Sequence, residues 1–416
     1  MSLFDQFISK AIVHGTLSVT FPTGETKSYG TPAEHYPDIK VRLADGKVAR
    51  DIAMKPELGA AEAYMDQRLI VEDDDIMGLL TLVRLNTPWE KGRGVGDASV
   101  FSRMWRHFHG RLDRINWSAR SKANVAHHYD LDDRLYDLFL DSHRQYSCGY
   151  FTDPSNSLEQ AQTDKMAHIA AKLALKPGQT VLDIGSGWGG MALYLHKISG
   201  ADVTGITLSE EQLRYANAAA AAAGVSDSVR FKLIDYRDVE GRFDRIVSVG
   251  MFEHVGPPNY QKFFQKCRDL LSDDGVMLLH TIGRMNEPGT SDRFITKYIF
   301  PGGYSPSLSE TVTASERTGL IISDVETLRL HYAYTLRHWY IRTMAARAEI
   351  TALYDERFFR MWQFYLSGAA TAFEHGILCN FQIQFVRERR TLPLTRDYIG
   401  ETEKQLRELV ASPPTP

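Results

Sequence analysis

Between residues 180 and 282, short apolar runs alternate with longer amphipathic stretches. The runs predict strands and the stretches predict helices, because side chains repeat every two residues in a strand and about every 3.6 in a helix. The expected strands span 180–184, 202–206, 229–234, 243–249 and 275–282, and the expected helices span 189–198, 209–223 and 258–271. This alternation predicts an α/β fold, a doubly wound, Rossmann-like parallel sheet that binds ligands at the carboxyl ends of its strands.

The regions on either side follow other patterns. Residues 15–45 alternate as strands do, and residues 57–86 have a helical pattern. Residues 283–320 are rich in glycine, proline and aromatic residues, as an inserted lid or substrate wall would be. Helical stretches near 333–348 and 351–375 then lead to a strand-like segment at 378–385.

These patterns divide the chain into a smaller mixed α+β domain and a larger catalytic one. The glycine-rich stretch at 87–96 is the best boundary. We expect an N-terminal domain at 1–100 that contacts lipid or membrane or mediates dimerisation, a linking helix at 101–125, a catalytic domain at 126–400 and a C-terminal tail at 401–416.

The first residues predict an amphipathic helix, because one face carries Leu3, Phe4, Phe7, Ile8, Ala11 and Ile12. We expect this stripe to pack against the protein itself, with contact to a membrane as the alternative.

The expected linking helix is basic and aromatic. Between Arg103 and Lys122 there are six Lys or Arg and one acid, interleaved with Trp105, Phe108 and Trp117. Such a helix either presents a solvated basic face or meets anionic phospholipid headgroups, and the two interpretations are compatible.

Composition excludes several classes. The formal net charge of −4 gives no sign of nucleic-acid binding. Three widely spaced cysteines indicate reduced thiols in a cytoplasm. No apolar run approaches the ~20 residues that span a bilayer, and the N-terminus is too polar for a signal peptide. The acidic triplet 73–75 predicts a helix start, and no metal site is expected because three consecutive side chains cannot converge on one ion.

The most informative segment is 181–190, Val-Leu-Asp-Ile-Gly-Ser-Gly-Trp-Gly-Gly, which predicts a strand, a tight turn and a helix N-terminus. Its glycines fit the dinucleotide pattern G-x-G-x-x-G, which alone is a weak signal. A dinucleotide also requires an acid at the end of the second strand, which instead ends in Thr-Leu-Ser at 207–209. Asp183, just before the turn, suits the ammonium and sulfonium of S-adenosylmethionine. The turn therefore favours S-adenosylmethionine over NAD.

The strand ends carry candidate contacts for this cofactor. Thr207 and Gln212 follow the second strand, where they suit the ribose and the amino-acid part. Asp235 follows the third strand and can accept from the adenine amine, a helix cap being the alternative. Tyr236 can flank the adenine ring.

Three further residues are candidates for chemistry. Glu253 follows the fourth strand, where this sheet order places it over the cofactor's methyl group. His280 lies inside the apolar fifth strand and is either a core residue or a functional one. Cys148 precedes the sheet and either folds over the cofactor or is a buried structural thiol.

Taken together, these segments resemble the cyclopropane-fatty-acyl-phospholipid synthase family, S-adenosylmethionine-dependent enzymes that alkylate the cis double bond of phospholipid acyl chains. The resemblance covers about residues 125–390 and implies a class I methyltransferase fold. The segment around 251–255, Met-Phe-Glu-His-Val, is the most specific. The matching segments are 128–130, 146–150, 161–165, 181–189, 203–212, 235–238, 243–256, 278–283, 297–301 and 360–362.

The resemblance implies two sets of site residues. Cofactor contacts are implied at Tyr146, Ser147, Asp183, Gly185, Gly187, Thr207, Gln212, Tyr236 and Arg237, to which the strand-end pattern adds Asp235. A bound bicarbonate ion is implied at Cys148, Glu253, His280, the backbone of Ile282, and Tyr332.

The chain departs from the family pattern at three places. Ser186 stands where the glycine turn usually has a cysteine. Ala369 occupies the position of a cysteine once favoured as a nucleophile, so no cysteine chemistry is assigned there. Residues 323–331 lack the common Asn-Phe-Gly run before Tyr332.

The expected reaction transfers the methyl carbon of S-adenosylmethionine to the cis double bond of unsaturated phospholipid acyl chains, with ring closure by bicarbonate as base. The alternatives are a C-methyltransferase that leaves methyl-branched or methylene chains, and a catalytically silent lipid-binding protein. We expect a cytoplasmic homodimer associated with the inner face of a phospholipid membrane, without nucleic-acid partners.

Overall fold

The computed structural model describes residues 2–91 and 131–411, and the chain forms two compact units. Unit 1 comprises residues 1–109, 290–301 and 336–377, and unit 2 comprises residues 110–289, 302–335 and 378–416. The expected linking helix, the boundary near residue 100 and the motif at 128–130 lie outside the described residues.

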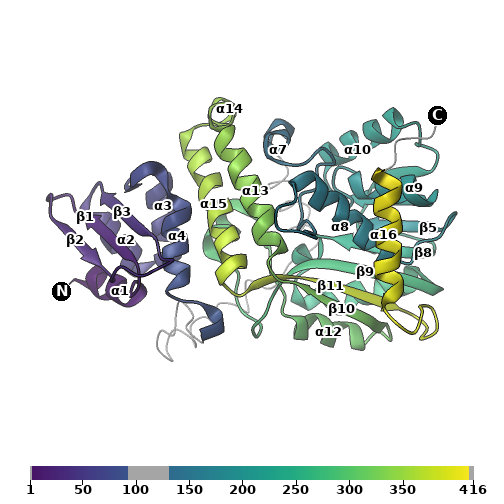
Figure 1. The fold of residues 1–416 in the computed structure, drawn as a ribbon. Coiled ribbons are helices and arrows are strands. Elements are labelled where there is room, and N and C mark those ends of the chain that lie inside the picture. Colours follow the sequence, from purple (N-terminus) through teal and green to yellow (C-terminus); the bar gives the residue numbers. More distant parts are fainter. Residues whose placement is uncertain (1, 92–130, 412–416) are drawn as a thin grey trace. The chain divides into compact units, whose positions relative to one another are not determined.

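Unit 2 is built on a seven-stranded sheet with the order β10-β11-β9-β8-β5-β6-β7 (Figure 1). Neighbouring strands from β5 to β9 are parallel, whereas β11 is antiparallel to both β9 and β10. The predicted doubly wound α/β class is confirmed, with an antiparallel strand added near one edge. The strands are β5 (Thr180–Ile184), β6 (Asp202–Thr207), β7 (Val229–Leu233), β8 (Phe243–Val249), β9 (Leu271–Arg284), β10 (Ile321–Leu328) and β11 (Leu378–Val386).

Helices cover both faces of this sheet (Figure 1). One core joins α8, α9 and α10 to Val181 of β5 and Leu278 of β9, and the other joins α11 to Leu182 of β5. Since side chains alternate along a strand, Asp183 and His280 lie on the face that α8 covers. The helices of unit 2 are α7 (Asp133–Phe139), α8 (Leu158–Lys172), α9 (Gly190–Ser199), α10 (Glu210–Ala222), α11 (Tyr260–Leu270), α12 (Leu308–Glu316), α16 (Asp397–Ala411) and the short η3 (Tyr236–Asp238), η4 (Phe252–His254) and η5 (Pro257–Asn259).

Three expectations for this part of the chain are corrected. The region 283–320, expected as an irregular insert, contains helix α12 with a capping box at Ser307. Strand β10 was not predicted. The expected tail at 401–416 begins as helix, because residues 397–411 form α16, which packs along α8 (Figure 1).

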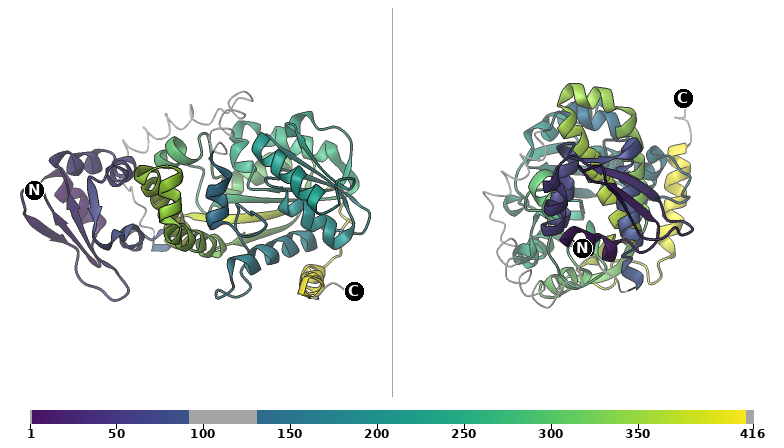
Figure 2. Two further views of the ribbon diagram at one scale, coloured as in Figure 1. Left: turned by 90° about the horizontal axis from the view of Figure 1, so that it is seen from above. Right: turned by 90° about the vertical axis from the view of Figure 1, so that its left-hand side faces the viewer.

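Unit 1 contains a small four-stranded sheet with the order β2-β1-β3-β4. Its N-terminal strands are drawn in purple in Figure 2. Helix α1 buries Phe4, Ile8 and Ile12 and leaves Leu3 exposed, so its apolar stripe packs against the protein as expected. Residues 57–86, expected as helical, are interrupted by strand β4, and the helix start expected at 73–75 is confirmed because Asp75 caps α4. The elements are α1 (Leu3–Ala11), β1 (Thr16–Thr20), β2 (Thr26–Tyr29), β3 (Asp38–Leu43), α2 (Gly46–Met54), α3 (Pro56–Met65), β4 (Leu69–Val71), η1 (Glu72–Asp74), α4 (Ile76–Leu85) and η2 (Trp89–Lys91).

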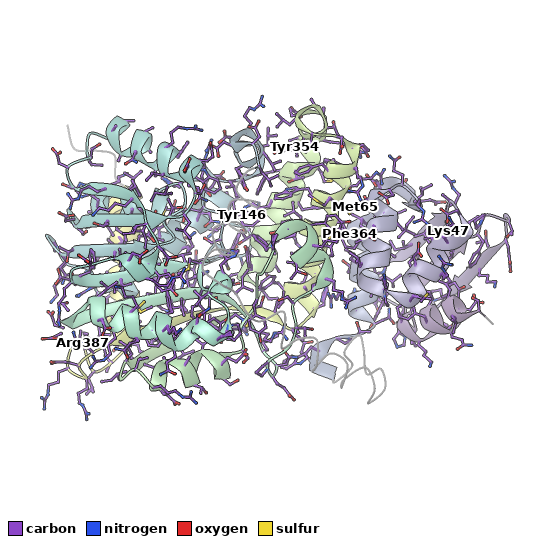
Figure 3. The ribbon with its side chains drawn as sticks, turned by 180° about the vertical axis from the view of Figure 1, so that it is seen from behind. Lys47, Met65, Tyr146, Tyr354, Phe364 and Arg387 are labelled. Atoms are coloured by element: carbon purple, nitrogen blue, oxygen red, sulfur yellow. The ribbon has the colours of Figure 1, made fainter. Side chains whose placement is uncertain are left out.

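Two later segments of the chain complete unit 1. They contain η6 (Ile295–Ile299), the end of α13 (His331–Ala345), α14 (Arg347–Leu353) and α15 (Glu356–His375). Helix α15 packs on α3 and α4, where the Tyr64 hydroxyl donates to Gln363 Oε1 at 2.7 Å. The ring of Phe364, labelled in Figure 3, lies 5.0 Å from that of Phe294. Part of the expected lid therefore belongs to the N-terminal unit.

A buried histidine joins helix α16 to helix α8 and strand β10 of the same unit. The two ring nitrogens of His168 on α8 lie 2.6 Å from Glu403 Oε1 on α16 and 2.7 Å from Glu326 Oε2 on β10. Burial raises the pKa of Glu326, but the hydrogen bond and charge of His168 and the charge of Lys172 outweigh it and hold that pKa well below its usual range. The sheet edge and the C-terminal helix thus share one cluster of charges.

We expect His168→Ala to lower the free energy of unfolding of unit 2 by about 3–5 kcal/mol, because two carboxylates lose the group between them. Since the pKa of Glu326 is depressed by folding, this stabilisation is present above its unfolded value, about 4.3, and is lost as the pH falls further. Urea unfolding at pH 7 and pH 4 measures the effect. His196→Ala, which removes one hydrogen bond to the Ala201 carbonyl, is the matched control and should cost about 1 kcal/mol. Equal losses in the two variants would contradict the role given to the cluster.

Candidate active site

The glycine turn lies between β5 and α9 at the carboxyl edge of the sheet. Gly185, Gly187 and Gly189 have φ angles of +84°, +55° and +88°, in the left-handed region that favours glycine. The backbone N–H groups of Gly185 and Ser186 donate to the Ile206 carbonyl at 3.0 and 2.9 Å. The Ser186 hydroxyl donates to the same carbonyl at 3.3 Å.

The residues expected to contact the cofactor all line one cavity at this edge. Backbone from the glycine turn, side chains from the ends of β6 and β7 and the loop before α8 form its wall, with Tyr146 of that loop labelled in Figure 3. The expected residues are Tyr146, Ser147, Asp183, Gly185, Gly187, Thr207, Gln212, Asp235, Tyr236 and Arg237. The structure therefore brings the whole predicted cofactor set together.

Hydrogen bonds orient several of these side chains. Thr207 Oγ1 donates to Gln212 Oε1 at 2.9 Å, which couples the two residues at the end of β6. Asp235 caps η3 and accepts from the N–H and Nε of Arg237 at 3.0 and 2.7 Å. Asp235 therefore caps a helix, as the alternative interpretation predicted, and it also lines the cavity. The ring of Tyr236 packs edge-on to Phe263 at 5.3 Å.

Asp183 supplies a buried carboxylate to this cavity. Its Oδ2 atom is buried and has no hydrogen-bond partner among residues 2–91 and 131–411. Burial raises the pKa of Asp183 to about 7, and the nearby charge of Lys165 opposes this shift. A buried carboxylate that needs a partner suits a cationic ligand.

The loop that carries Tyr146, Ser147 and Cys148 is tied to two helices. Gln162 Nε2 of α8 donates to the Ser147 carbonyl at 2.9 Å, and the Gly149 N–H donates to Thr335 Oγ1 of α13 at 2.9 Å. Burial raises the pKa of Cys148, so this residue remains a neutral thiol. The second of these bonds joins the Cys148 loop to the helix that carries Tyr332.

Glu253 and Ile282 are in direct contact. The Ile282 N–H donates to Glu253 Oε1 at 2.6 Å, while Glu253 Oε2 is buried without a hydrogen-bond partner in the described part of the chain. Burial raises the pKa of Glu253 to about 7, although the hydrogen bond from Ile282 lowers it. The carboxylate is therefore fixed at one oxygen and available at the other, directly after β8.

His280 is buried between two amide side chains of β11. Its Nε2 lies 3.3 Å from Asn380 Nδ2 and its Nδ1 lies 3.2 Å from Gln382 Nε2. Burial lowers the pKa of His280 to about 3, so the ring is neutral. Cys148, Glu253, His280, Ile282 and Tyr332 are not among the residues that line the cofactor cavity.

Sequence reasoning did not assign Asn380 and Gln382, although a signal was present. In 378–385, Leu-Cys-Asn-Phe-Gln-Ile-Gln-Phe, polar residues recur at every second position of a buried strand. A stripe of amides along one face of such a strand indicates buried polar partners. The stripe faces His280 and α8.

Comparison with known proteins agrees with this geometry. The family model for mycolic acid cyclopropane synthetase matches residues 117–383. The chain is 38% identical to the cyclopropane-fatty-acyl-phospholipid synthase of Escherichia coli (strain K12) over 358 residues, 84% of this chain and 88% of the relative. It is 38% identical to the tuberculostearic acid methyltransferase of Mycobacterium tuberculosis over 404 residues, 93% of this chain and 91% of the relative. A crystal structure of a mycolic acid cyclopropane synthase complexed with SAH and CTAB is 35% identical, with a TM-score of 0.61 over 64% of this chain and 97% of that chain.

Proposed function

Since the chain belongs to the mycolic acid cyclopropane synthetase family, we propose that it forms cyclopropane rings on the unsaturated acyl chains of phospholipids. The family comprises S-adenosylmethionine-dependent transferases that act on lipid acyl chains, and this chain is such a methyltransferase. The observation that carries the finer proposal is the buried carboxylate of Glu253, held at one oxygen by Ile282 and unpartnered at the other.

The cofactor is assigned to the cavity at the glycine turn. The cofactor's ammonium would pair with Asp183, whose buried Oδ2 lacks a partner among the described residues. Its ribose and adenine contact the ends of β6 and β7, and the backbone of the glycine turn allows close approach because no Cβ stands in the way.

Ring formation requires a new carbon–carbon bond and the loss of one proton. The π electrons of the alkene attack the sulfonium methyl, the bond from sulfur to that methyl breaks, and a cationic centre develops on the adjacent carbon. Loss of a proton from the new methyl closes the ring, and no enzyme nucleophile is needed. Bicarbonate, when bound, supplies the base for that proton.

The residues near Glu253 fit such an anion. The free oxygen of the ionised Glu253 would hold such an ion by accepting a hydrogen bond from its O–H. The Cys148 thiol and the His280 ring are both neutral, and the thiol donates to the Gly149 carbonyl at 3.3 Å while both ring nitrogens contact amides of β11, so either residue would have to exchange such a contact to donate to the ion. Burial of these groups also keeps water from the cationic centre.

Lipid analysis of cells that express the protein tests this proposal. We expect mass spectrometry to show unsaturated acyl chains that have gained CH2 and resist hydrogenation, because a ring is not reduced as an alkene is. Cells that express Glu253→Gln provide the control. Unchanged lipids with the wild-type protein would contradict the proposal.

One alternative product is supported by a relative. The match covers 91% of the tuberculostearic acid methyltransferase. A C-methyltransferase that leaves a methyl-branched or methylene chain is therefore the second candidate. Chains that gain CH2 but are reduced by hydrogenation, or that carry a methyl branch, would favour it. The retention of Cys148, Glu253, His280, Ile282 and Tyr332 favours ring closure.

We also infer that the protein works at a membrane surface, since its substrate is embedded in a bilayer. We further propose that it forms a homodimer. None of the helices among the described residues is long and apolar enough to cross one. Leu3 and Met54 of unit 1 are 73% and 70% exposed and offer apolar contacts for such a surface. Sedimentation with phospholipid vesicles measures binding to the membrane surface, and the mass of the protein in solution measures dimerisation.

A further inference from the structure

Lys165 of α8 is a fully buried lysine whose ammonium contacts the wall of the cofactor cavity. Its Nζ donates to Gln145 Oε1 at 2.7 Å and to Ser147 Oγ at 2.9 Å, and both of these residues line the cavity. Burial lowers the pKa of Lys165 to about 8. A lysine is almost never fully buried unless it is paired, so this one needs a charged partner.

The charged and titratable groups that face Lys165 come from several elements. Asp141, Cys148 and Asp183 raise its pKa, and Lys165 in turn lowers that of His280. Asp183 lies on the face of β5 that α8 covers, and the charge of Lys165 opposes the effect of burial on the pKa of the Asp183 carboxyl. The charge on Asp183 therefore depends on the charge on Lys165.

We propose that Lys165 is a positioning residue that keeps Asp183 ionised for the cofactor's ammonium and so sets the pH range of cofactor binding. This inference rests on the proposed contact between Asp183 and the cofactor. It has a distinctive consequence for the pH dependence of binding. Removing Lys165 weakens binding at low pH, where Asp183 then carries a proton, but not at high pH, where Asp183 is ionised with or without Lys165.

The test is calorimetric titration of S-adenosylhomocysteine, which retains the ammonium, between pH 6 and pH 9 with wild type, Lys165→Met, Lys165→Gln and Lys165→Arg. The ligand's own amine titrates identically in each series, so the ratio of variant to wild-type affinity is the readout. We expect Lys165→Met and Lys165→Gln to raise the pKa of Asp183. Their affinity at pH 6 should fall by up to about tenfold for each unit of that rise. The ratio should return to one by pH 9, and Lys165→Arg should stay near wild type.

Lys172→Met is the matched control. Lys172 is equally buried on the same helix, but it pairs with Asp324 at 3.4 Å and with Glu326 and does not line the cavity. Its affinity ratio should not vary with pH. A pH-independent ratio for the Lys165 variants would overturn the proposal, because loss of packing alone has no such pH dependence. Lys165→Gln keeps polar atoms near Ser147 and carries the test if Lys165→Met does not fold.

Asp183→Asn separates this inference from the cofactor assignment on which it depends. We expect Asp183→Asn to weaken binding and to abolish the pH dependence, so that adding Lys165→Met to it removes no further affinity at pH 6. Wild-type affinity in Asp183→Asn would overturn the assignment of Asp183. Weak binding in Asp183→Asn together with an additive loss in the double variant would overturn the role of Lys165 alone.

Discussion

Glu253→Gln is expected to lower the turnover number by about 10²- to 10⁴-fold, the range for loss of a positioned proton-transfer group. The amide oxygen can still accept from the Ile282 N–H, so the backbone contact survives. The amide nitrogen then occupies the buried position of Oε2 and cannot accept from the O–H of bicarbonate. Steady-state kinetics with an unsaturated phospholipid measures the loss. Binding of S-adenosylhomocysteine should remain within about twofold, because Glu253 does not line the cofactor cavity.

The pH profile gives the same prediction a second readout. Burial raises the pKa of Glu253 to about 7, and the proposed role requires the ionised form, which is populated above that pH. Turnover of the wild-type enzyme should therefore rise as the pH increases through about 7, and this limb should be absent in Glu253→Gln. Glu403→Gln, a change at an equally buried carboxyl, is the control and should leave turnover per folded molecule unchanged. Near-normal turnover in Glu253→Gln, or no response of its residual rate to added bicarbonate, would remove Glu253 from the mechanism.

Gly185→Ala is expected to destabilise unit 2 by about 2–5 kcal/mol and to abolish detectable cofactor binding. A left-handed φ costs a non-glycine residue about 1–2 kcal/mol, and crowding of a packed site adds about 1–3 kcal/mol. The crowding arises because the new Cβ would lie 2.8 Å from Met251 Cβ. Chemical denaturation measures the stability, and titration with S-adenosylhomocysteine measures the binding.

Gly187→Ala is the matched comparison for this prediction. Gly187 also has a positive φ, but a Cβ added there meets nothing within 4 Å. Its stability should fall only by the backbone cost of about 1–2 kcal/mol, so the difference between the two variants isolates the contact with Met251. Equal losses of stability would show that crowding at Gly185 is relieved by movement of the methionine.

Much of the catalytic sheet could be predicted from the sequence, because its inner strands are short apolar runs with clear ends. Strands β5 and β8 begin and end where the pattern places them. Strand β10 was missed because Asp324 and Glu326 interrupt its apolar character. These acids are stabilised in the fold by Lys172 and His168 of α8. A local pattern cannot show that such charges find partners more than 150 residues away.

The candidate site, like the sheet, was only partly predictable from the sequence. The cofactor residues were predictable because parallel strands deliver their carboxyl ends to one edge, where Asp183, Thr207 and Asp235 meet. The sequence left the role of His280 open, since a histidine in an apolar strand is equally a core residue. Its amide partners come from β11, about 100 residues later in the chain, and only the antiparallel register of β9 and β11 brings them to it.

Unit 1 is built from three separate segments of the chain, which limits where the protein can be divided. The chain passes from one unit to the other after residues 109, 289, 301, 335 and 377. A truncation that removes the N-terminal residues therefore deletes part of a unit and strips α15 of the partners that Tyr64 and its neighbours provide. A single proteolytic cut near residue 100 would release the N-terminal residues from covalent connection, whereas residues 290–301 and 336–377 of unit 1 would stay covalently joined to unit 2. A fragment that keeps unit 2 whole must accordingly also carry residues 290–301 and 336–377 of unit 1.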